Sequence, residues 1–381
     1  MNFKYLTDYI DHLYETEGIP SSDIVVYQHG KELYRHSAGV MDLKTGEPIR
    51  RDALYFMYSA SKLLTVTATL QLLERGKILL RDPVAQYLPE FADIKVRTVG
   101  DRLEESLVKP RHTLRIWNLM TMTSGLPYNM KAPEILRCME EHNGAPSTAD
   151  IVAAFAKRPL SFHPGEHWMY GFSHDVLARL VEAVAGIPFG QYVKENIFDP
   201  IGMQNSYFHL TDDLIPRMAM QYKFDAAQNK AVEYGLRNEH IFGPSFESGG
   251  AGCISCVDDY LLFAETLTHL GVAPNGNRIL SSRAVNLMRT DCLNEKTRPD
   301  FNWDAFRGYG YGLGVRTLVH PEVGGTLSSL GDFGWGGAAG AYVHADPERE
   351  LSIVYIQHML NSKEPIVHPR LRNLVYAALE Y

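Results

Sequence analysis

Ser59 and Lys62 stand three residues apart in Tyr58-Ser59-Ala60-Ser61-Lys62, where a loop leads into a long apolar run. In a helix this spacing is about one turn, so the hydroxyl and the ammonium group share a face. A serine hydroxyl must lose its proton before it attacks a carbonyl carbon, and a lysine on a buried helix needs partners or a function. The pair therefore predicts a serine nucleophile with a lysine partner. Taken alone, the string is more typical of an ordinary serine N-cap followed by a lysine.

Four further segments follow this pair along the chain. They are Leu119–Pro127, with Thr-Ser-Gly-Leu-Pro; Phe162–Tyr170, with Pro-Gly-x-x-Trp-x-Tyr; Gly249–Ser255, with Gly-Gly-Ala-Gly; and Gly334–Gly337, with Gly-Trp-Gly-Gly. In this order, the five motifs together resemble the serine β-lactamase-like hydrolases, which include class C β-lactamases, D-alanyl-D-alanine carboxypeptidases, family VIII carboxylesterases and lovastatin-type acyltransferases. The resemblance extends from about residue 20 to 360 and implies an α+β fold of the β-lactamase/transpeptidase type.

The resemblance implies roles for individual residues. Ser59 corresponds to the acylated nucleophile, Lys62 to its lysine partner, and Tyr170 to the tyrosine of the second motif, the general base of the family. Tyrosine and lysine side chains in isolation both keep their protons at neutral pH, so the two would have to act as one coupled proton acceptor. Which of the two takes the proton is left open by the sequence.

The third motif supplies the remaining predicted site residues. Gly336 and Gly337 correspond to its end, on an edge strand of the sheet beside the site. The backbone N–H groups of the nucleophilic serine and of Ala338 correspond to the oxyanion hole. Trp335 and the two glycines are expected to contact the substrate, and Tyr128 either lines the pocket or faces solvent.

Two departures from the family pattern narrow the prediction. Lactamases and peptidases have Tyr-x-Asn in the second motif, whereas this chain has Tyr170-Gly171-Phe172; their third motif begins with Lys or His followed by Thr or Ser, whereas this chain has Trp335-Gly336. The amide, the cation and the hydroxyl that would hold a lactam substrate are therefore absent from these positions. Trp335 offers one N–H and a large apolar face instead. Both departures are similar to the family VIII esterases and the lovastatin-type acyltransferases.

We therefore expect hydrolysis, or transfer to an alcohol, of the acyl group of a small-molecule ester or amide through an acyl-Ser59 intermediate, without metal or cofactor. Hydrolysis of β-lactams or D-amino-acid peptides on the same residues is the alternative among enzymes. A catalytically inactive binding protein of this fold is the alternative from another class. The loops between 95 and 150 and between 205 and 245 are expected to set the pocket volume, while the natural substrate is left open.

Three other strings suggest chemistry that their context does not favour. His163-Pro164-Gly165-Glu166-His167 matches the H-x-x-E-H of a zinc-peptidase class, but Pro-Gly inside it prevents the helix that such a site needs. Cys253 and Cys256 form a C-x-x-C string without a second pair or a βαβ context, which indicates two packed thiols. The glycines between Gly308 and Gly314 do not fit G-x-G-x-x-G and favour a close backbone approach.

Strand-like segments lie near both ends of the chain, and helices and loops fill the middle. Helices are predicted at 4–18, 60–75, 149–157, 174–185, 257–270 and 366–380, and strands at 23–29, 33–41, 309–319, 338–345 and 351–358. We expect residues 1–75 and 305–381 to form an antiparallel sheet flanked by helices. Residues 76–304 are expected to form a mainly helical insert within one intertwined catalytic unit. The helix at 60–75 is apolar nearly all round, which predicts that it is buried.

Composition excludes several classes of protein. The 381 residues are 45% hydrophobic and carry a net charge of −8 without a Lys/Arg cluster, which argues against nucleic-acid binding. We expect no membrane association, because no apolar stretch is long enough to span a bilayer. The first residues show no signal-peptide pattern and four cysteines make no disulfide framework, so a cytoplasmic location is expected. The sequence leaves the oligomeric state open.

Overall fold

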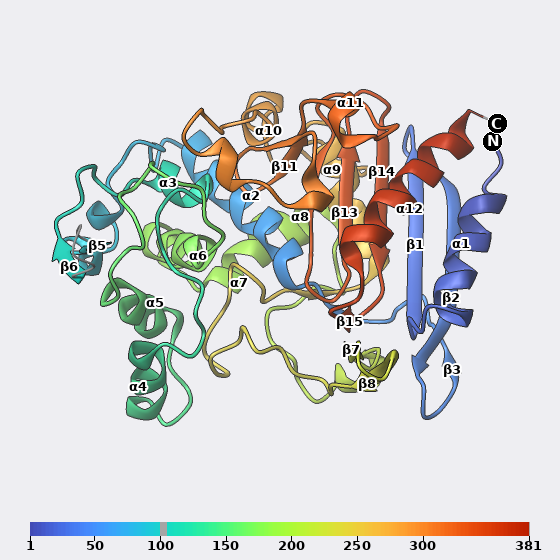
Figure 1. Cartoon of the computed structure of the whole chain (residues 1–381), viewed down its shortest axis with the longest axis horizontal. Helices are drawn as coiled ribbons and strands as arrows, with labels where there is room; N and C mark the ends of the chain where they lie inside the picture. Colours follow the sequence, from blue (N-terminus) through green and yellow to red (C-terminus); the bar gives the residue numbers. More distant parts are fainter. Residues whose placement is uncertain (100–104, 381) are drawn as a thin grey trace.

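Both ends of the chain contribute strands to one eight-stranded antiparallel sheet in the computed structural model, which describes residues 1–99 and 105–380 (Figure 1). The strands lie across the sheet in the order β10 (Tyr309–Tyr311), β11 (Arg316–Leu318), β12 (Phe333–Gly336), β13 (Tyr342–Asp346), β14 (Leu351–Ile356), β1 (Ser21–Gln28), β2 (Lys31–Asp42) and β3 (Glu47–Pro48). Strand β1 pairs with β14, with Val25 opposite Val354. The prediction that sequence-distant strands share one sheet is confirmed.

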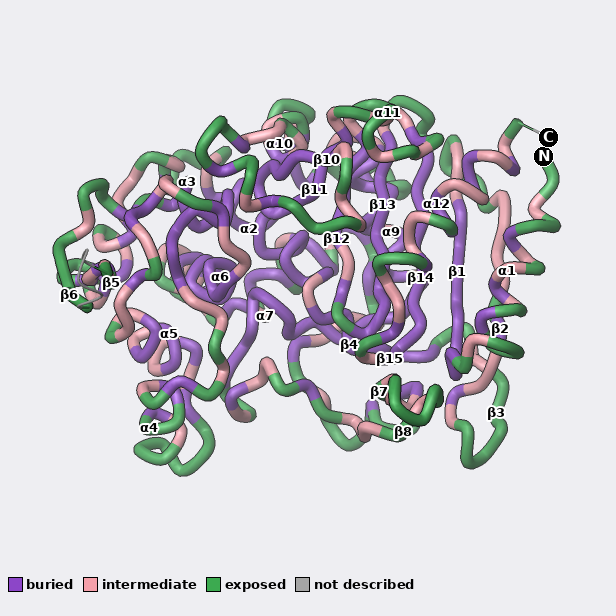
Figure 2. Tube along the Cα trace, in the orientation of Figure 1, coloured by how far each residue is buried: buried purple, intermediate pink, exposed green. Residues whose placement is uncertain are grey.

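Alternate residues of the central strands face two different layers. Ile24 and Val26 of β1 pack in a cluster with α1 (Lys4–Glu15) and α12 (Glu364–Leu379). Val25, between them, belongs to the larger core on the other face, together with α9 (Val257–Thr268). Successive side chains of a strand point to opposite faces, so both faces of this sheet need apolar cover. Strands β1 and β14 are accordingly buried along most of their length (Figure 2).

The remaining helices are α2 (Ser61–Glu74), α3 (Ile116–Met120), α4 (Pro133–Glu141), α5 (Thr148–Ala156), α6 (Ser173–Ala185), α7 (Phe189–Val193), α8 (Asp199–Ile201), α10 (Ser282–Met288) and α11 (Pro321–Gly324). Helices α3 to α6 lie towards the end of the molecule opposite α1 (Figure 1). The middle of the chain also holds short strands: β5 (Val96–Val99) pairs with β6 (Glu105–Val108), and β7 (Tyr222–Asp225) pairs with β8 (Lys230–Glu233). Two middle strands pair with strands nearer the chain ends, β7 with β15 (Met359–Leu360) and β9 (Ile254–Ser255) with β4 (Tyr55–Phe56). The middle is therefore less purely helical than predicted.

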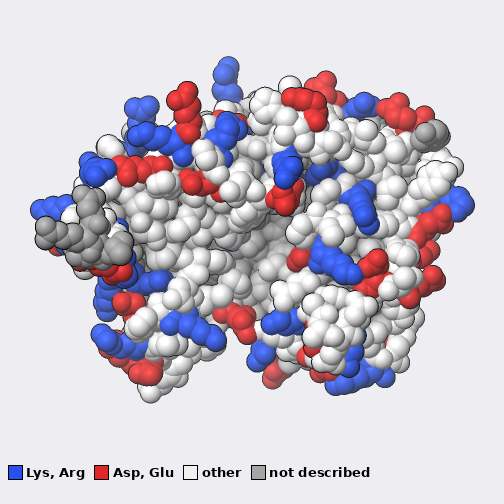
Figure 3. Space-filling model, in the orientation of Figure 1, with Lys and Arg blue, Asp and Glu red and all other residues white. Residues whose placement is uncertain are grey.

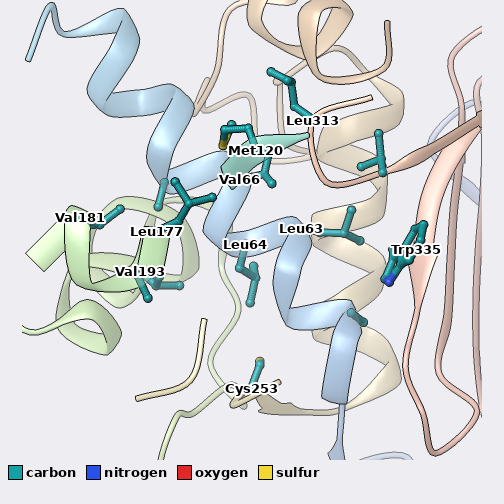
Figure 4. Close-up of a cluster of buried hydrophobic side chains, with 14 of the residues drawn as sticks. Leu63, Leu64, Val66, Met120, Leu177, Val181, Val193, Cys253, Leu313 and Trp335 are labelled. Atoms are coloured by element: carbon teal, nitrogen blue, oxygen red, sulfur yellow. The ribbon is translucent and has the colours of Figure 1, made fainter. Parts of the chain in front are cut away.

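Helix α2 is buried on all sides, as its apolar pattern predicts. Residues 61–72 are buried without interruption. Figure 4 shows Leu63 of α2 towards Trp335 of the sheet, while Leu177 of α6 and Val193 of α7 lie on the other side of the helix. A helix that is packed from both sides cannot shift or fray easily, so its first turn is a firmly held platform.

The C-terminal strands differ from the prediction in two places. The predicted strand at 309–319 is two short strands, β10 and β11, because Gly312 to Val315 make a turn in which the Gly312 N–H donates to the Val315 carbonyl. The predicted strand at 338–345 begins only at Tyr342, since residues 337–340 form a turn closed by the Gly340 N–H and the Gly337 carbonyl.

Strand β12, which carries the third motif, is not an edge strand as predicted. It lies between β11 and β13 in the sheet order. However, β11 pairs with β12 only at Phe333 and Gly334, whereas β13 pairs with all four residues of the strand. Trp335 and Gly336 therefore have a strand partner on one side only.

Among the described residues, no single helix is long and apolar enough to cross a bilayer. One bent pair of helices, Ser173–Ala185 with Phe189–Ile201, reaches the required length and composition when the two are taken together.

Candidate active site

Ser59 lies in a strained turn that leads into α2. The turn, Tyr58–Ala60, is one short 3₁₀ segment, and Tyr58 has φ +45°, a backbone conformation that side chains other than glycine rarely adopt. Tyr58 is buried and its hydroxyl donates to Gln221 Oε1 at 2.6 Å, which holds the turn in place. Strained residues of this kind persist where the surrounding structure fixes them, and they often lie at functional sites. Ser59 itself is partly exposed at the wall of a cavity.

Lys62 is fully buried and makes three contacts at the predicted site. Its Nζ donates to Ser59 Oγ at 3.2 Å and to the Gly250 carbonyl at 2.7 Å. It also lies 4.6 Å from the centre of the Tyr170 ring, which is cation–π geometry. The structure therefore brings Ser59, Lys62 and Tyr170 together, as the sequence predicted.

Tyr170 is held from its other side by Trp335. The indole Nε1 donates to the Tyr170 hydroxyl at 3.3 Å, and the two rings stack with centres 5.9 Å apart. In the part of the chain that the structure describes, no hydrogen bond joins the Tyr170 hydroxyl to Ser59 Oγ. Catalytic hydrogen bonds often tighten only when substrate is bound, so this geometry is compatible with a base.

The glycines of the third motif bring the end of β12 against the serine turn. A Cβ atom at Gly337 would lie 2.2 Å from the Met57 carbonyl oxygen, so no larger residue fits there. Ala338 follows in the exposed turn beside the cavity. Its backbone N–H donates to no acceptor among the described residues, so it is free to meet an oxyanion. The end of β12 thus lies where the resemblance requires it.

The Gly249–Gly250 segment positions Lys62, and it depends on a residue that the sequence did not single out. Asp175 of α6 is buried and accepts hydrogen bonds from the Gly250 N–H, at 3.1 Å, and from Ser248 Oγ. Burial raises the pKa of Asp175 above its ordinary value. A Cβ at Gly249 would lie 2.5 Å from the His174 carbonyl oxygen, so the glycine permits this close approach.

A cavity of about 570 Å³ opens beside Ser59. Four aromatic side chains form one wall of it, from Tyr170, Trp303, Phe306 and Trp335. Figure 3 shows a hollow near the centre of one face of the molecule, with mostly uncharged atoms around it. None of the lining residues in the described ranges comes from the loops between 95 and 150 or between 205 and 245. The expectation that those loops set the pocket is wrong for this cavity.

The other end of the cavity is polar and was not predicted. Its lining residues come from β11, β13 and α12, and they are Arg316, Tyr342, Glu364, His368 and Arg372. The sequence indicated only that the third motif lacks its usual cation, because Trp335 stands in place of Lys or His. Two arginines from other strands and helices line the same cavity. The sequence feature that could have indicated this polar end is Arg316, a charged residue within the apolar run 309–319.

Tyr128 packs behind Tyr170 and is not among the described residues that line the cavity. Its ring meets the Tyr170 ring edge-on at 5.6 Å. Its hydroxyl lies 2.8 Å from Nδ1 of His240, a residue that the sequence did not suggest. Burial lowers the pKa of His240 to about 4, and the nearby charge of Lys62 acts in the same direction. His240 is therefore neutral at pH 7 and holds Tyr128 in place.

The strings set aside in the sequence make ordinary contacts. His163 Nδ1 accepts from the Arg111 backbone N–H, and His167 Nδ1 lies 3.1 Å from Asp300 Oδ2. Cys253 and Cys256 are buried free thiols. Among the described residues, no group of three or more His, Cys, Asp or Glu side chains could hold a metal ion.

The sheet, the buried α2 and the serine–lysine–tyrosine cluster at its first turn define a β-lactamase/transpeptidase-like protein. The Beta-lactamase family profile matches residues 6–378, and the chain belongs to this family. An uncharacterized protein of Mycobacterium tuberculosis is 33% identical over 88% of this chain and 84% of its own length. Esterase EstB of Burkholderia gladioli is 28% identical over 93% of this chain and 90% of its own. Unliganded simvastatin synthase (LovD) of Aspergillus terreus has a TM-score of 0.83 at 22% identity, covering 99% of this chain and 98% of that chain.

Proposed function

We propose that this protein hydrolyses or transfers the acyl group of small-molecule esters through an acyl-Ser59 intermediate. The observation that carries the proposal is the position of Lys62 Nζ, 3.2 Å from Ser59 Oγ and 4.6 Å from the centre of the Tyr170 ring, beside an open cavity. The relative named as esterase EstB supports this class of reaction.

The first half of the reaction forms the acyl-enzyme. Ser59 Oγ attacks the ester carbonyl carbon, and its proton passes to the Tyr170–Lys62 pair. The backbone N–H groups of Ser59 and Ala338 donate to the oxyanion that develops on the carbonyl oxygen. When the tetrahedral intermediate collapses, the bond to the alcohol oxygen breaks, and the pair returns the proton to the departing alcohol.

The second half of the reaction releases the acyl group. Water or a second alcohol enters the cavity and loses a proton to the same pair as its oxygen attacks the acyl-Ser59 carbonyl. The bond to Ser59 Oγ then breaks, and Ser59 regains the proton. Water gives a free acid and an alcohol gives a new ester, so hydrolysis and transfer differ only in the acceptor.

Trp335 favours esters over lactams. It lies in the third motif where lactamases place a cation, and its buried indole donates its N–H to Tyr170. The indole face forms an apolar surface together with the rings of Phe306 and Trp303. An acyl chain that packs against this surface removes apolar area from water, which is favourable. A carboxylate pressed against that wall would lose hydration without a partner there.

Intact-mass spectrometry tests the proposal directly. We expect a fluorophosphonate probe to add one mass label to the wild-type chain, at Ser59 by peptide mapping, and p-nitrophenyl butyrate to be turned over. Ser59→Ala is expected to abolish both, whereas Ser282→Ala, at the exposed first position of α10, keeps both. A chain that takes no label and cleaves no ester would instead be the inactive binding protein of this fold.

A further inference from the structure

Two buried arginines lie at the end of the cavity under α12. Arg316 of β11 is 1% exposed and Arg372 of α12 is 4% exposed. Within the described residues, neither guanidinium forms an ion pair. The nearby buried carboxyl of Asp332 lies 3.7 Å from His344 Nδ1 instead. Asp332 acts electrostatically on both arginines from beyond ion-pair distance, and the centre of the Tyr342 ring lies 4.7 Å from the Arg316 guanidinium carbon. A buried guanidinium without a hydrogen-bonded carboxylate is costly, so its place in a cavity wall needs an explanation.

The two arginines differ in how far their hydrogen bonds are satisfied. Arg372 donates from Nε to Thr326 Oγ1 at 2.9 Å and from Nη1 to the Tyr342 hydroxyl at 3.5 Å. Arg316 donates one long bond of 3.4 Å, from Nη2 to the Val343 carbonyl, and its Nε is buried without a partner. A guanidinium has five N–H donors, so Arg316 keeps most of its hydrogen-bonding capacity unused.

The cavity connects this end to the nucleophile past Gly336. A Cβ atom at Gly336 would lie 3.7 Å from His368 Cε1, so a side chain there would narrow the passage between β12 and α12. Burial and the neighbouring charge of Arg316 lower the pKa of His368 to about 3, so this ring stays neutral. The same cavity is therefore apolar beside Trp335, whereas its other end is lined by two arginines and the carboxyl of Glu364.

We propose that Arg316 binds a carboxylate of the substrate, so that the preferred esters of this protein are anionic. This inference rests on the proposed ester chemistry at Ser59 and narrows its substrate class. A guanidinium matches a carboxylate with two parallel charge-assisted hydrogen bonds, which are about twice as strong as neutral ones. The carboxylate belongs to the acyl part or to the alcohol part of the ester, and the two sources share this chemistry.

Two matched pairs of esters distinguish these sources. For the acyl side, mono-p-nitrophenyl adipate is compared with its methyl ester, which has the same chain without the charge. For the alcohol side, 4-butyryloxybenzoate is compared with its methyl ester. We expect the anionic member of one pair to have a kcat/KM at least about tenfold above its neutral partner, which corresponds to one charge-assisted bond.

Arg316→Gln tests whether that preference comes from the proposed residue. We expect the ratio of anionic to neutral kcat/KM to fall about tenfold or more. The matched control is Arg35→Gln, which removes a half-buried arginine of β2 that is paired with Asp258, and it should leave the ratio unchanged. A preference that survives Arg316→Gln would overturn the assignment, because another group would then hold the carboxylate.

Glutarate gives a readout on the wild-type protein that requires no folded variant. We expect glutarate to inhibit cleavage of p-nitrophenyl butyrate by the wild-type protein, and dimethyl glutarate to inhibit it at least about tenfold more weakly. Neutral esters cleaved without any anionic preference, and without inhibition by glutarate, would overturn the carboxylate site and leave the proposed function standing. If no ester is cleaved, the proposed function fails. The site is then judged by whether glutarate raises the Tm of the wild-type protein, and no rise overturns it.

Discussion

Lys62 and Arg316 are two buried cations near one cavity, and their surroundings differ: Arg316 lines the cavity, whereas Lys62 lies behind Ser59. The Lys62 ammonium is satisfied by protein groups alone, with Ser59 Oγ and the Gly250 carbonyl as acceptors and the Tyr170 ring against it. The Arg316 guanidinium has one long hydrogen bond and an unpartnered Nε. A group that acts in every turnover has to be preorganised before substrate arrives, whereas a group that recognises substrate has to keep donors free for it. The cavity therefore has a catalytic end at Ser59 and a recognition end at Arg316.

The largest effect is expected at Ser59. Ser59→Ala removes the atom that becomes acylated, so we expect ester turnover to fall below detection while the Tm changes little, because the side chain is partly exposed. Ester turnover and thermal unfolding of the same preparation check both statements. Wild-type activity in this variant, or a covalent label mapped to another residue, would remove Ser59 from the mechanism.

Lys62 and Tyr170 are expected to act as one proton-transfer unit in catalysis. Lys62→Ala and Tyr170→Phe should each lower kcat by about three orders of magnitude, and the double variant should be little worse than the worse single one, since coupled catalytic groups are not additive. A double-mutant cycle on p-nitrophenyl butyrate measures this. Tyr128→Phe serves as the aromatic control, because its hydroxyl contacts His240 behind the site. Strictly additive losses would show that the two residues act independently.

The choice between esters and lactams is expected to show a smaller effect. We expect short and medium p-nitrophenyl esters to have a kcat/KM about 10²-fold above a chromogenic cephalosporin, a gap of roughly 3 kcal/mol in transition-state binding. The reason is that Trp335 replaces the cation and hydroxyl of the third motif beside Ser59. Both substrates are measured on one preparation. Equal or better cephalosporin turnover would restore the lactamase alternative and would mean that the arginine end serves a lactam carboxylate.

The smallest expected effect concerns stability near Arg316. Burial raises the pKa of Asp332 to about 6, so the folded protein keeps this proton at pH values where the unfolded chain, with a pKa of about 4, has lost it. The free energy of unfolding should therefore decrease by about 2 to 3 kcal/mol as the pH rises from 4 to 6. Asp332→Asn should remove this slope in denaturant titrations.

Asp23 provides the reference for that measurement. Burial raises its pKa to about 6 as well, and it lies on β1 with Ser37 as its hydrogen-bond partner. Asp23 makes the same contribution to the pH dependence of unfolding in the wild type and in Asp332→Asn. The difference between the two curves of unfolding free energy against pH therefore isolates the contribution of Asp332. An opposite slope, with the wild type gaining stability towards pH 6, would show that folding lowers the pKa of Asp332 instead of raising it.

Much of the catalytic end could be read from the sequence. Ser59 and Lys62 are neighbours along one helical turn, so their proximity follows from local geometry. The apolar run of α2 predicted its burial, and the flanking strings of Tyr170 and of Gly336–Gly337 predicted that these segments meet it. These features could be predicted because each motif is one contiguous stretch of sequence, which local spacing and the family resemblance are enough to identify.

The recognition end was decided by the tertiary structure. Arg316 and Arg372 belong to a strand and a helix that are 56 positions apart in the chain, and no local pattern places them in one cavity wall. Trp303 and Phe306 likewise reach the cavity from a loop outside every motif. The sequence determined which residues start the chemistry, because Ser59 and Lys62 stand three residues apart where the 3₁₀ turn leads into α2. Which charges and apolar surfaces face the substrate depended on how the C-terminal strands and α12 pack over β12, and that packing is a property of the whole fold.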